Sequence, residues 1–193
     1  MEEWGVSNLL KRSNVDNRYR TFLYSLHLLN KRKQMKKFDE PQALSDVALF
    51  HDTFNAPILD SPQIPGADRC ALRVALLQEE LNELKEAIKD KDIVEIADAL
   101  ADIQYVLSGA VLEFGLGHKF KALFDEVQRS NMSKACASLQ EAEATQKAYS
   151  KKDGTSSFIE QKEGKFLVYR EGDNKVLKSV NYSPANLSKI LTS

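Results

Sequence analysis

Acidic residues at helical spacing are the feature of this sequence best suited to chemistry. In chain order they are Glu79, Glu80, Glu83, Glu95 and Asp98. Residues three and four positions apart share one face of an α-helix, so the first three form one group and the last two a second. Asp102 continues the second group by one more turn. Carboxylate oxygens grouped in this way suit magnesium, manganese or calcium better than zinc.

The second group lacks the basic residues that usually accompany acids on a helix. Like charges one turn apart oppose helix formation by roughly 0.2–0.5 kcal/mol per pair, and a Lys or Arg four positions later is the usual compensation. The residues four positions beyond its three acids are instead Ala99, Asp102 and Val106. The first group is a weaker signal, because Lys85 and Lys89 supply positive charge there. A bound divalent cation therefore explains the pattern better than a solvated helix face.

Other metal sites need residues that this sequence does not place at the required spacing. A carboxylate-bridged di-iron bundle needs Glu-x-x-His on two helices. The three histidines, which are His27, His51 and His118, do not follow the acids in that way. Cys70 and Cys136 have no partner at zinc-finger spacing, and we expect both thiols to be packed on helix faces. Calcium-loop, Walker and Gly-x-Ser-x-Gly motifs are also missing from the sequence.

Two long amphipathic helices are expected to position the acids. Apolar residues recur every three or four positions over residues 68–88 and again over residues 93–114. Residues 89–92 form a short turn between these helices, and the Gly-Leu-Gly sequence at 115–117 ends the second one. Helices joined by so short a turn pack antiparallel, which can put the two acidic groups opposite each other.

Shorter elements are expected on both sides of this hairpin. A helix is predicted over residues 45–55, followed by a proline-rich loop at 56–67, and further helices at 119–127 and 139–149. Three strand-like runs follow, at residues 157–160, 165–169 and 175–177. The predicted fold class is mainly α, with antiparallel helical hairpins forming a bundle and a small C-terminal β-hairpin or meander.

Composition and charge predict three regions. Residues 1–44 are a basic extension, or residues 1–34 lie upstream of a natural start at Met35. Residues 45–150 are the helical domain, and residues 151–193 are a β appendage and tail. The net charge of -1 disfavours a general nucleic-acid binder, and no apolar run approaches the roughly 20 residues that span a membrane. We expect a cytoplasmic protein, given two unpaired cysteines and no signal-peptide pattern.

Four stretches of the sequence resemble one known family. The EELNE sequence at 79–83 and EIAD at 95–98 resemble the EExxE and ExxD signature of the all-α nucleotide pyrophosphohydrolases. The runs at 98–109 and 129–134, the latter reading RSNMSK, are similar to the MazG-like or phosphoribosyl-ATP pyrophosphohydrolase-like branch, also called Cof-like. The resemblance extends over about residues 45–187 and implies an all-α NTP pyrophosphatase bundle.

This resemblance implies roles for particular residues. The implied magnesium ligands are Glu80, Glu83, Glu95 and Asp98. Glu79 is expected to orient or deprotonate the attacking water, and Glu79 and Glu80 are the catalytic candidates. Asp102 is either an outer-sphere ligand or a helix-face partner. The candidates for substrate binding are Asn131, Lys134 and Lys178.

Aromatic residues leave two alternatives open. Tyr105 either stacks on a base or fills the core, and the core is the favoured interpretation. His51 and Phe54 either wall a base pocket or pack within the helical domain.

The predicted function is Mg²⁺-dependent hydrolysis of a nucleoside triphosphate to its monophosphate and pyrophosphate, with Mn²⁺ as a substitute. Nucleotide-pool housecleaning is the expected role, and dUTP or a noncanonical NTP is a candidate substrate. The alternative is a nonhydrolytic nucleotide sensor or scaffold of the same fold, and a nucleic-acid adaptor acting through residues 1–44 is a third hypothesis. Wide apolar stripes on the hairpin predict a homodimer.

Overall fold

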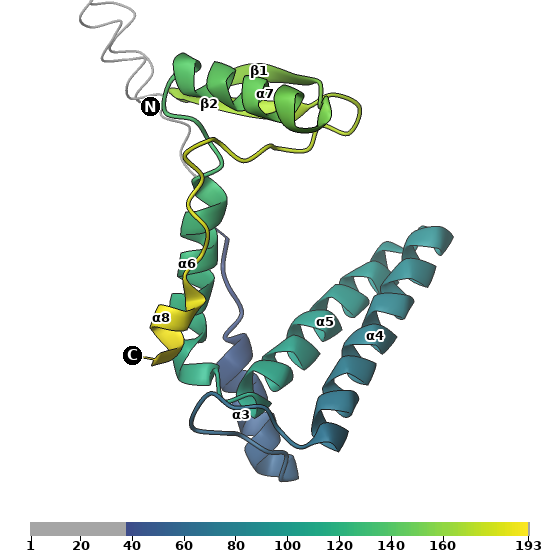
Figure 1. Ribbon diagram of the computed structural model, residues 1–193. Helices are drawn as coiled ribbons and strands as arrows, with labels where there is room; N and C mark the ends of the chain where they lie inside the picture. The colour runs from purple at the N-terminus through teal and green to yellow at the C-terminus, as the bar shows by residue number, and fades with distance from the viewer. Residues whose placement is uncertain (1–37, 193) are drawn as a thin grey trace, which may run out of the picture. The chain divides into compact units, whose positions relative to one another are not determined.

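The computed structural model describes residues 38–192 (Figure 1). The chain divides into two units after Pro41, and the second unit begins at Gln42. The predicted basic extension and the alternative start at Met35 therefore lie largely outside the described residues. The helices and strands of the second unit are α3 (Ala43–Phe54), α4 (Ala67–Asp90), α5 (Ile93–Glu113), the 3₁₀-helix η1 (Gly117–Lys119), α6 (Phe120–Met132), α7 (Leu139–Asp153), β1 (Ser157–Lys162), β2 (Lys165–Arg170) and α8 (Leu187–Thr192).

Helices α4 and α5 form the predicted hairpin, which is visible in Figure 1. Lys91 ends α4 in the left-handed conformation, with a φ of 58°. Asp92 then caps α5, because its carboxylate accepts hydrogen bonds from the backbone N–H groups of Val94 (2.9 Å) and Glu95 (3.2 Å). This capping satisfies two of the backbone donors that every helix leaves free at its start. The boundary between the two helices therefore follows from two adjacent residues.

The proline-rich loop between α3 and α4 is fastened to the end of α5. The N–H groups of Leu59 and Gln63 donate to the carbonyls of Leu112 and Phe114, both at 3.1 Å. Gly115 has a φ of +67°, and a Cβ at this position would lie 1.9 Å from the carbonyl oxygen of Ser61. Only glycine therefore allows the loop to approach the backbone this closely.

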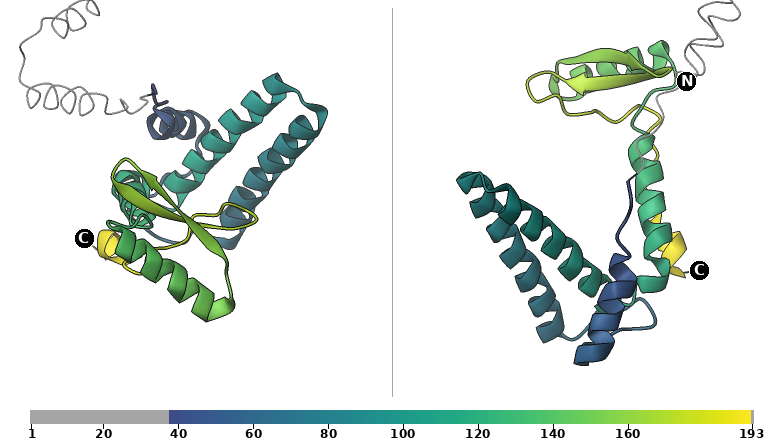
Figure 2. Two further views of the ribbon diagram at one scale, coloured as in Figure 1. Left: turned by 90° about the horizontal axis from the view of Figure 1, so that it is seen from above. Right: turned by 180° about the vertical axis from the view of Figure 1, so that it is seen from behind.

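A second core is built by α7 and the two strands. It contains Cys136, Ala142, Val168 and Leu177, all buried, with Cys136 in the link between α6 and α7. The strands pair antiparallel, with Ser157 opposite Arg170 and Lys162 opposite Lys165, as Figure 2 shows from two further sides. The third predicted strand is reduced to an isolated bridge between Tyr169 and Val176. The appendage is thus a hairpin and not a meander.

The predicted mainly α fold class is confirmed, with further differences among the C-terminal helices. Helix α6 continues to Met132, beyond the predicted end at residue 127, and α8 was not predicted. None of the helices in the described part is by itself long and apolar enough to cross a membrane. Helix α5 and residues 117–132 are long and apolar enough only when taken together, and this pair is bent by 110°.

Candidate functional site

Glu80 is a carboxylate on α4 with one buried oxygen. Its Oε2 atom is shielded from solvent and has no hydrogen-bond partner among the described residues. Burial raises the pKa of Glu80, and the negative charges of Glu83, Asp102, Glu79 and Asp98 raise it further. A buried acceptor without a donor is costly unless another group supplies positive charge. Glu80 is therefore the centre of the candidate site.

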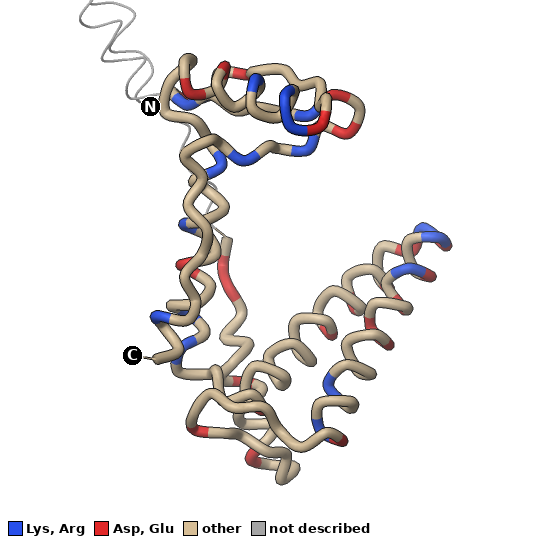
Figure 3. The backbone as a smooth tube through the Cα atoms, in the orientation of Figure 1, with Lys and Arg blue, Asp and Glu red and all other residues tan. Residues whose placement is uncertain are grey.

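The acids around Glu80 come from both helices of the hairpin. Glu79 and Glu83 lie on α4, while Asp98 and Asp102 lie on α5, as the antiparallel arrangement predicted. Helix α5 contains no Lys or Arg, and in Figure 3 it carries acidic but no basic residues between its ends. Asp102, for which the sequence left two roles open, thus belongs electrostatically to the same group as Asp98. The sequence indicated this grouping through the spacing of one helical turn between Asp98 and Asp102.

The remaining predicted ligand stands at the edge of this group. Glu95 lies in the first turn of α5, one turn before Asp98, and is exposed. Among the described residues, no three or more His, Cys, Asp or Glu side chains are arranged closely enough to hold a metal ion. The donor set is nevertheless all oxygen, and its central member has an unsatisfied buried atom. In donor chemistry, these residues fit a hard divalent cation.

Another carboxylate on the hairpin has the opposite surroundings. Glu113, at the end of α5, is fully buried and accepts hydrogen bonds from Arg69 and Arg73 of α4. Burial alone would raise the pKa of Glu113, but the hydrogen bonds and charges of the two arginines outweigh it and lower the pKa. This ion cluster was not predicted, because 40 residues or more separate Glu113 from either partner in the sequence.

His51 joins the ion cluster and is a packing residue. Its Nδ1 donates to the carbonyl of Pro57 at 2.8 Å, which leaves Nε2 facing Arg73 Nη2 at 3.3 Å. Gly109 of α5 makes room for this contact, since a Cβ there would lie 2.7 Å from Arg73 Nη1 and 3.1 Å from His51 Nε2. The histidine therefore fastens α3 to the hairpin.

The aromatic residues of α3 meet Tyr105 at the surface. Tyr105 is 40% exposed, so the favoured interpretation as a core residue is wrong. Its ring stands edge-on to Phe50, with the centroids 5.7 Å apart, and Phe50 lies 4.5 Å from Phe54. Phe54 is 65% exposed, and its contact with Phe50 lies at the surface. The patch of Phe50, Phe54 and Tyr105 is therefore available for stacking, as base pockets require.

The three residues predicted to bind substrate lie near one another. Lys134 Nζ donates to Asn131 Oδ1 at 2.9 Å, at the end of α6. Lys178 is not on a strand, because the chain has left the sheet by then, and its ammonium lies 4.4 Å from the ring centroid of Tyr182. The N–H of Ser179 donates to the carbonyl of Lys134 at 3.3 Å. The C-terminal segment thus brings Lys178 to the end of α6.

Comparison with known families gives a match in the helical part of the chain. Residues 47–131 match the family model of phosphoribosyl-ATP pyrophosphohydrolase, and this stretch contains all the acids described above. This match is consistent with the all-α NTP pyrophosphohydrolase superfamily. The match covers somewhat less than half of the chain and ends before Lys134 and Lys178. No curated protein sequence matches the chain.

The name of the matched family indicates a class of reaction. A pyrophosphohydrolase breaks a phosphoanhydride bond in a nucleotide-like substrate, and the family generally depends on a metal ion. The acids of α4 and α5 are the described residues with the donor chemistry for that ion.

Proposed function

We propose that the protein is a magnesium-dependent pyrophosphohydrolase that converts a nucleoside triphosphate to the monophosphate and pyrophosphate. The observation that carries this proposal is the unsatisfied, buried oxygen of Glu80 among four further carboxylates. A helix pair with this charge distribution gains stability when a cation binds, and the family match supplies the reaction class.

Each residue of the site has a separate proposed role. Glu80, Glu83, Glu95 and Asp98 are the proposed ligands, with Asp102 near them as an outer-sphere partner. When bound, Mg²⁺ neutralises charge on the polyphosphate and lowers the pKa of water. Glu79 is exposed beside Glu80 and accepts the proton of the attacking water. Lys134 and Lys178 hold the phosphates, and the amide of Asn131 contacts the sugar or the edge of the base.

Pyrophosphate release in the presence of Mg²⁺ tests this function. We expect turnover of at least one nucleotide, abolished by EDTA, and a loss on the order of a hundredfold or more in Glu80→Gln. Glu86→Gln is the matched control, because Glu86 lies on the same helix, is exposed and pairs with Lys89 at 2.8 Å. Equal turnover by wild type and Glu80→Gln would exclude the proposed site.

The substrate panel should contain all common NTPs and dNTPs, dUTP, several noncanonical triphosphates and phosphoribosyl-ATP. Preference for dUTP or a noncanonical base fits nucleotide-pool housecleaning. Thermal stabilisation by a nucleotide with no turnover on the whole panel would instead identify a sensor. The exposed patch of Phe50, Phe54 and Tyr105 is the proposed surface for the base.

We also propose that the protein is a homodimer joined through the hairpin. Large apolar side chains stay exposed on both of its helices, among them Val74, Ile88, Ile93, Val94 and Leu100, each more than half exposed. Exposed apolar side chains in this number favour an interaction site on the hairpin. Light scattering at micromolar concentration should give the mass of a dimer, and Leu100→Glu should shift it toward the monomer. A monomeric wild type would contradict this.

A further inference from the structure

The C-terminal segment carries two residues to the end of α6, outside the part of the chain that matches the family. Tyr182 lies with its hydroxyl 2.9 Å from Ser130 Oγ, and Ser130 is buried in the last part of α6. The ammonium of Lys178 sits over the Tyr182 ring at 4.4 Å. The hydroxyls of Ser130 and Tyr182 and the ammonium of Lys178 therefore lie together at the end of α6.

Lys134 adds a second ammonium to this group. Its charge and that of Lys178 both act on Tyr182, and the pKa of Tyr182 is lowered, first by the hydrogen bond with Ser130 and then by the two lysines. Neither lysine forms an ion pair with a carboxylate in the part of the chain that the structure describes. Both positive charges act on the same tyrosine, and an anion bound beside them would be attracted by both.

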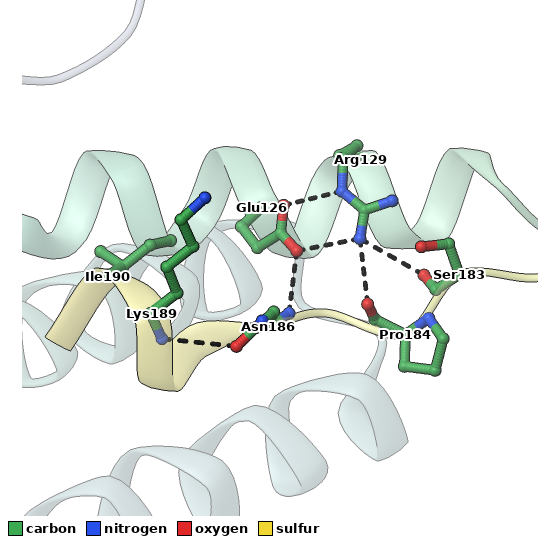
Figure 4. Close-up of a pocket in the computed structure, with 7 residues that line it drawn as sticks. All are labelled: Glu126, Arg129, Ser183, Pro184, Asn186, Lys189 and Ile190. Carbon is green, nitrogen blue, oxygen red and sulfur yellow. Dashed lines mark hydrogen bonds and ion pairs between the residues drawn. The ribbon is translucent and has the colours of Figure 1, made fainter. Parts of the chain in front are cut away.

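The tail that carries these residues is firmly attached to α6. Arg129 Nη2 donates to the carbonyl of Pro184 at 3.0 Å, and Glu126 accepts from the N–H of Asn186 at 2.8 Å (Figure 4). Glu126 also pairs with Arg129 at 2.7 Å, and these bonds lower the pKa of Glu126 to about 2. The groove of about 580 Å³ at this place is lined by groups that already bind one another. These bonds attach the C-terminal segment to α6 and thereby fix the positions of Lys178 and Tyr182.

We propose that Lys134, Lys178, Ser130 and Tyr182 form a binding site for a polyphosphate, to which the C-terminal segment contributes half of the residues. The two ammonium groups contact the phosphate oxygens, because ammonium suits phosphate as a point charge. Tyr182 is a positioning residue that holds Lys178 by the interaction between cation and ring. The polyphosphate is that of the substrate proposed above, and in this respect the inference rests on the proposed function.

Binding of inorganic tripolyphosphate to the full chain in EDTA tests the site without metal or turnover. By calorimetry, we expect Lys178→Met and Tyr182→Leu to weaken binding at least about tenfold. Tyr182→Phe should stay within about twofold of wild type, because the ring remains under Lys178. Lys165→Met, which removes an exposed lysine at the start of β2, is the matched control and should bind normally.

The circular-dichroism unfolding midpoint of each variant separates lost binding from lost folding. If Tyr182→Leu does not fold, Lys178→Met decides alone, since its side chain is exposed. Unchanged affinity in Lys178→Met, or no binding by wild type, overturns the inference. Glu80→Gln should bind tripolyphosphate normally, so a failure of the proposed hydrolysis is distinguished from a failure of this site.

Discussion

Glu80 and Glu113 are both glutamates on the α4–α5 hairpin, and burial by itself raises the pKa of both, yet the charged groups around them have opposite signs. Glu113 is fully buried and paired with two arginines, and its pKa is lowered. Glu80 has a buried oxygen without a partner and four neighbouring carboxylates, and its pKa is raised. The chain therefore compensates the charge that holds the helices together and leaves the charge at the candidate site uncompensated.

The difference separates a structural carboxylate from a functional one. Removing the charge of Glu113 leaves the guanidinium of Arg73 without its anionic partner, and Arg73 is itself only 9% exposed. Removing the charge of Glu80 takes away repulsion. Opposite effects on stability are therefore expected from the same chemical change on one hairpin.

The largest effect is expected for Glu113→Gln. Breaking a buried ion pair from one side typically costs about 3–5 kcal/mol, because the remaining charge stays buried. Denaturant unfolding of the metal-free protein should show a loss of that order. Glu86→Gln, which breaks an exposed pair on α4, should cost at most about 1 kcal/mol. Similar small losses in both variants would remove the contrast between the two regions.

Gly109→Ala should disturb the ion cluster without changing any charge. The added Cβ would approach Arg73 Nη1 to 2.7 Å and His51 Nε2 to 3.1 Å, and both side chains are buried. Overpacking of this kind costs about 1–3 kcal/mol. The unfolding free energy reports the loss, and Gly66→Ala serves as the control because a Cβ at Gly66 meets nothing within 4 Å. Equal stability of Gly109→Ala and wild type would mean that the cluster is loosely packed.

The two glutamates should change the free energy of unfolding in opposite directions as the pH rises. The pKa of Glu113 is lowered on folding, so its contribution is fully present above the unfolded value of about 4.3 and is lost as the pH falls through the folded pKa. The pKa of Glu80 is raised, so its contribution is present below the unfolded value and is lost as the pH rises through the folded pKa.

Unfolding curves at several pH values, recorded in EDTA, measure both contributions. The deficit of Glu113→Gln relative to wild type should shrink toward low pH, since wild type then loses its own ion pair. The balance between Glu80→Gln and wild type should move in favour of the variant as the pH rises above about 4.3. Parallel curves for either variant and wild type would contradict the assigned pKa direction.

The smallest effect is expected for Glu80→Gln in EDTA at neutral pH. The amide removes repulsion from Glu83 and Asp102 and can donate a hydrogen bond to a neighbouring carboxylate. The metal-free variant should be as stable as wild type or slightly more stable, measured by denaturant unfolding. A clear destabilisation would give Glu80 the same structural role as Glu113.

The sequence was sufficient where local rules decide the structure. The hairpin follows from apolar periodicity, and its turn follows from Asp92, whose side chain caps α5. The association of Glu80 with Asp98 and Asp102 follows from helical spacing and the antiparallel turn. These features need few contacts between distant residues.

Features that depend on distant contacts were not predictable. The pairing of Glu113 with Arg73 requires the packed hairpin, and the sequence offers only an acid at the end of an apolar run. The run at 175–177 reads as a strand, but its hydrogen bonds to β2 form a single bridge, Tyr169–Val176, before the chain turns toward α6. Tyr182 gave no signal, because its role depends on Ser130 of α6.

The most direct test of the account is the effect of Mg²⁺ on thermal unfolding. A ligand that binds only the folded state at a hundred times its Kd stabilises by about 2.7 kcal/mol. We predict that saturating Mg²⁺ raises the Tm of wild type and of Glu86→Gln by several degrees and leaves that of Glu80→Gln almost unchanged. An equal rise in Glu80→Gln, or no rise in wild type with Mg²⁺ or Mn²⁺, would contradict the claim that the acids of α4 and α5 bind the metal.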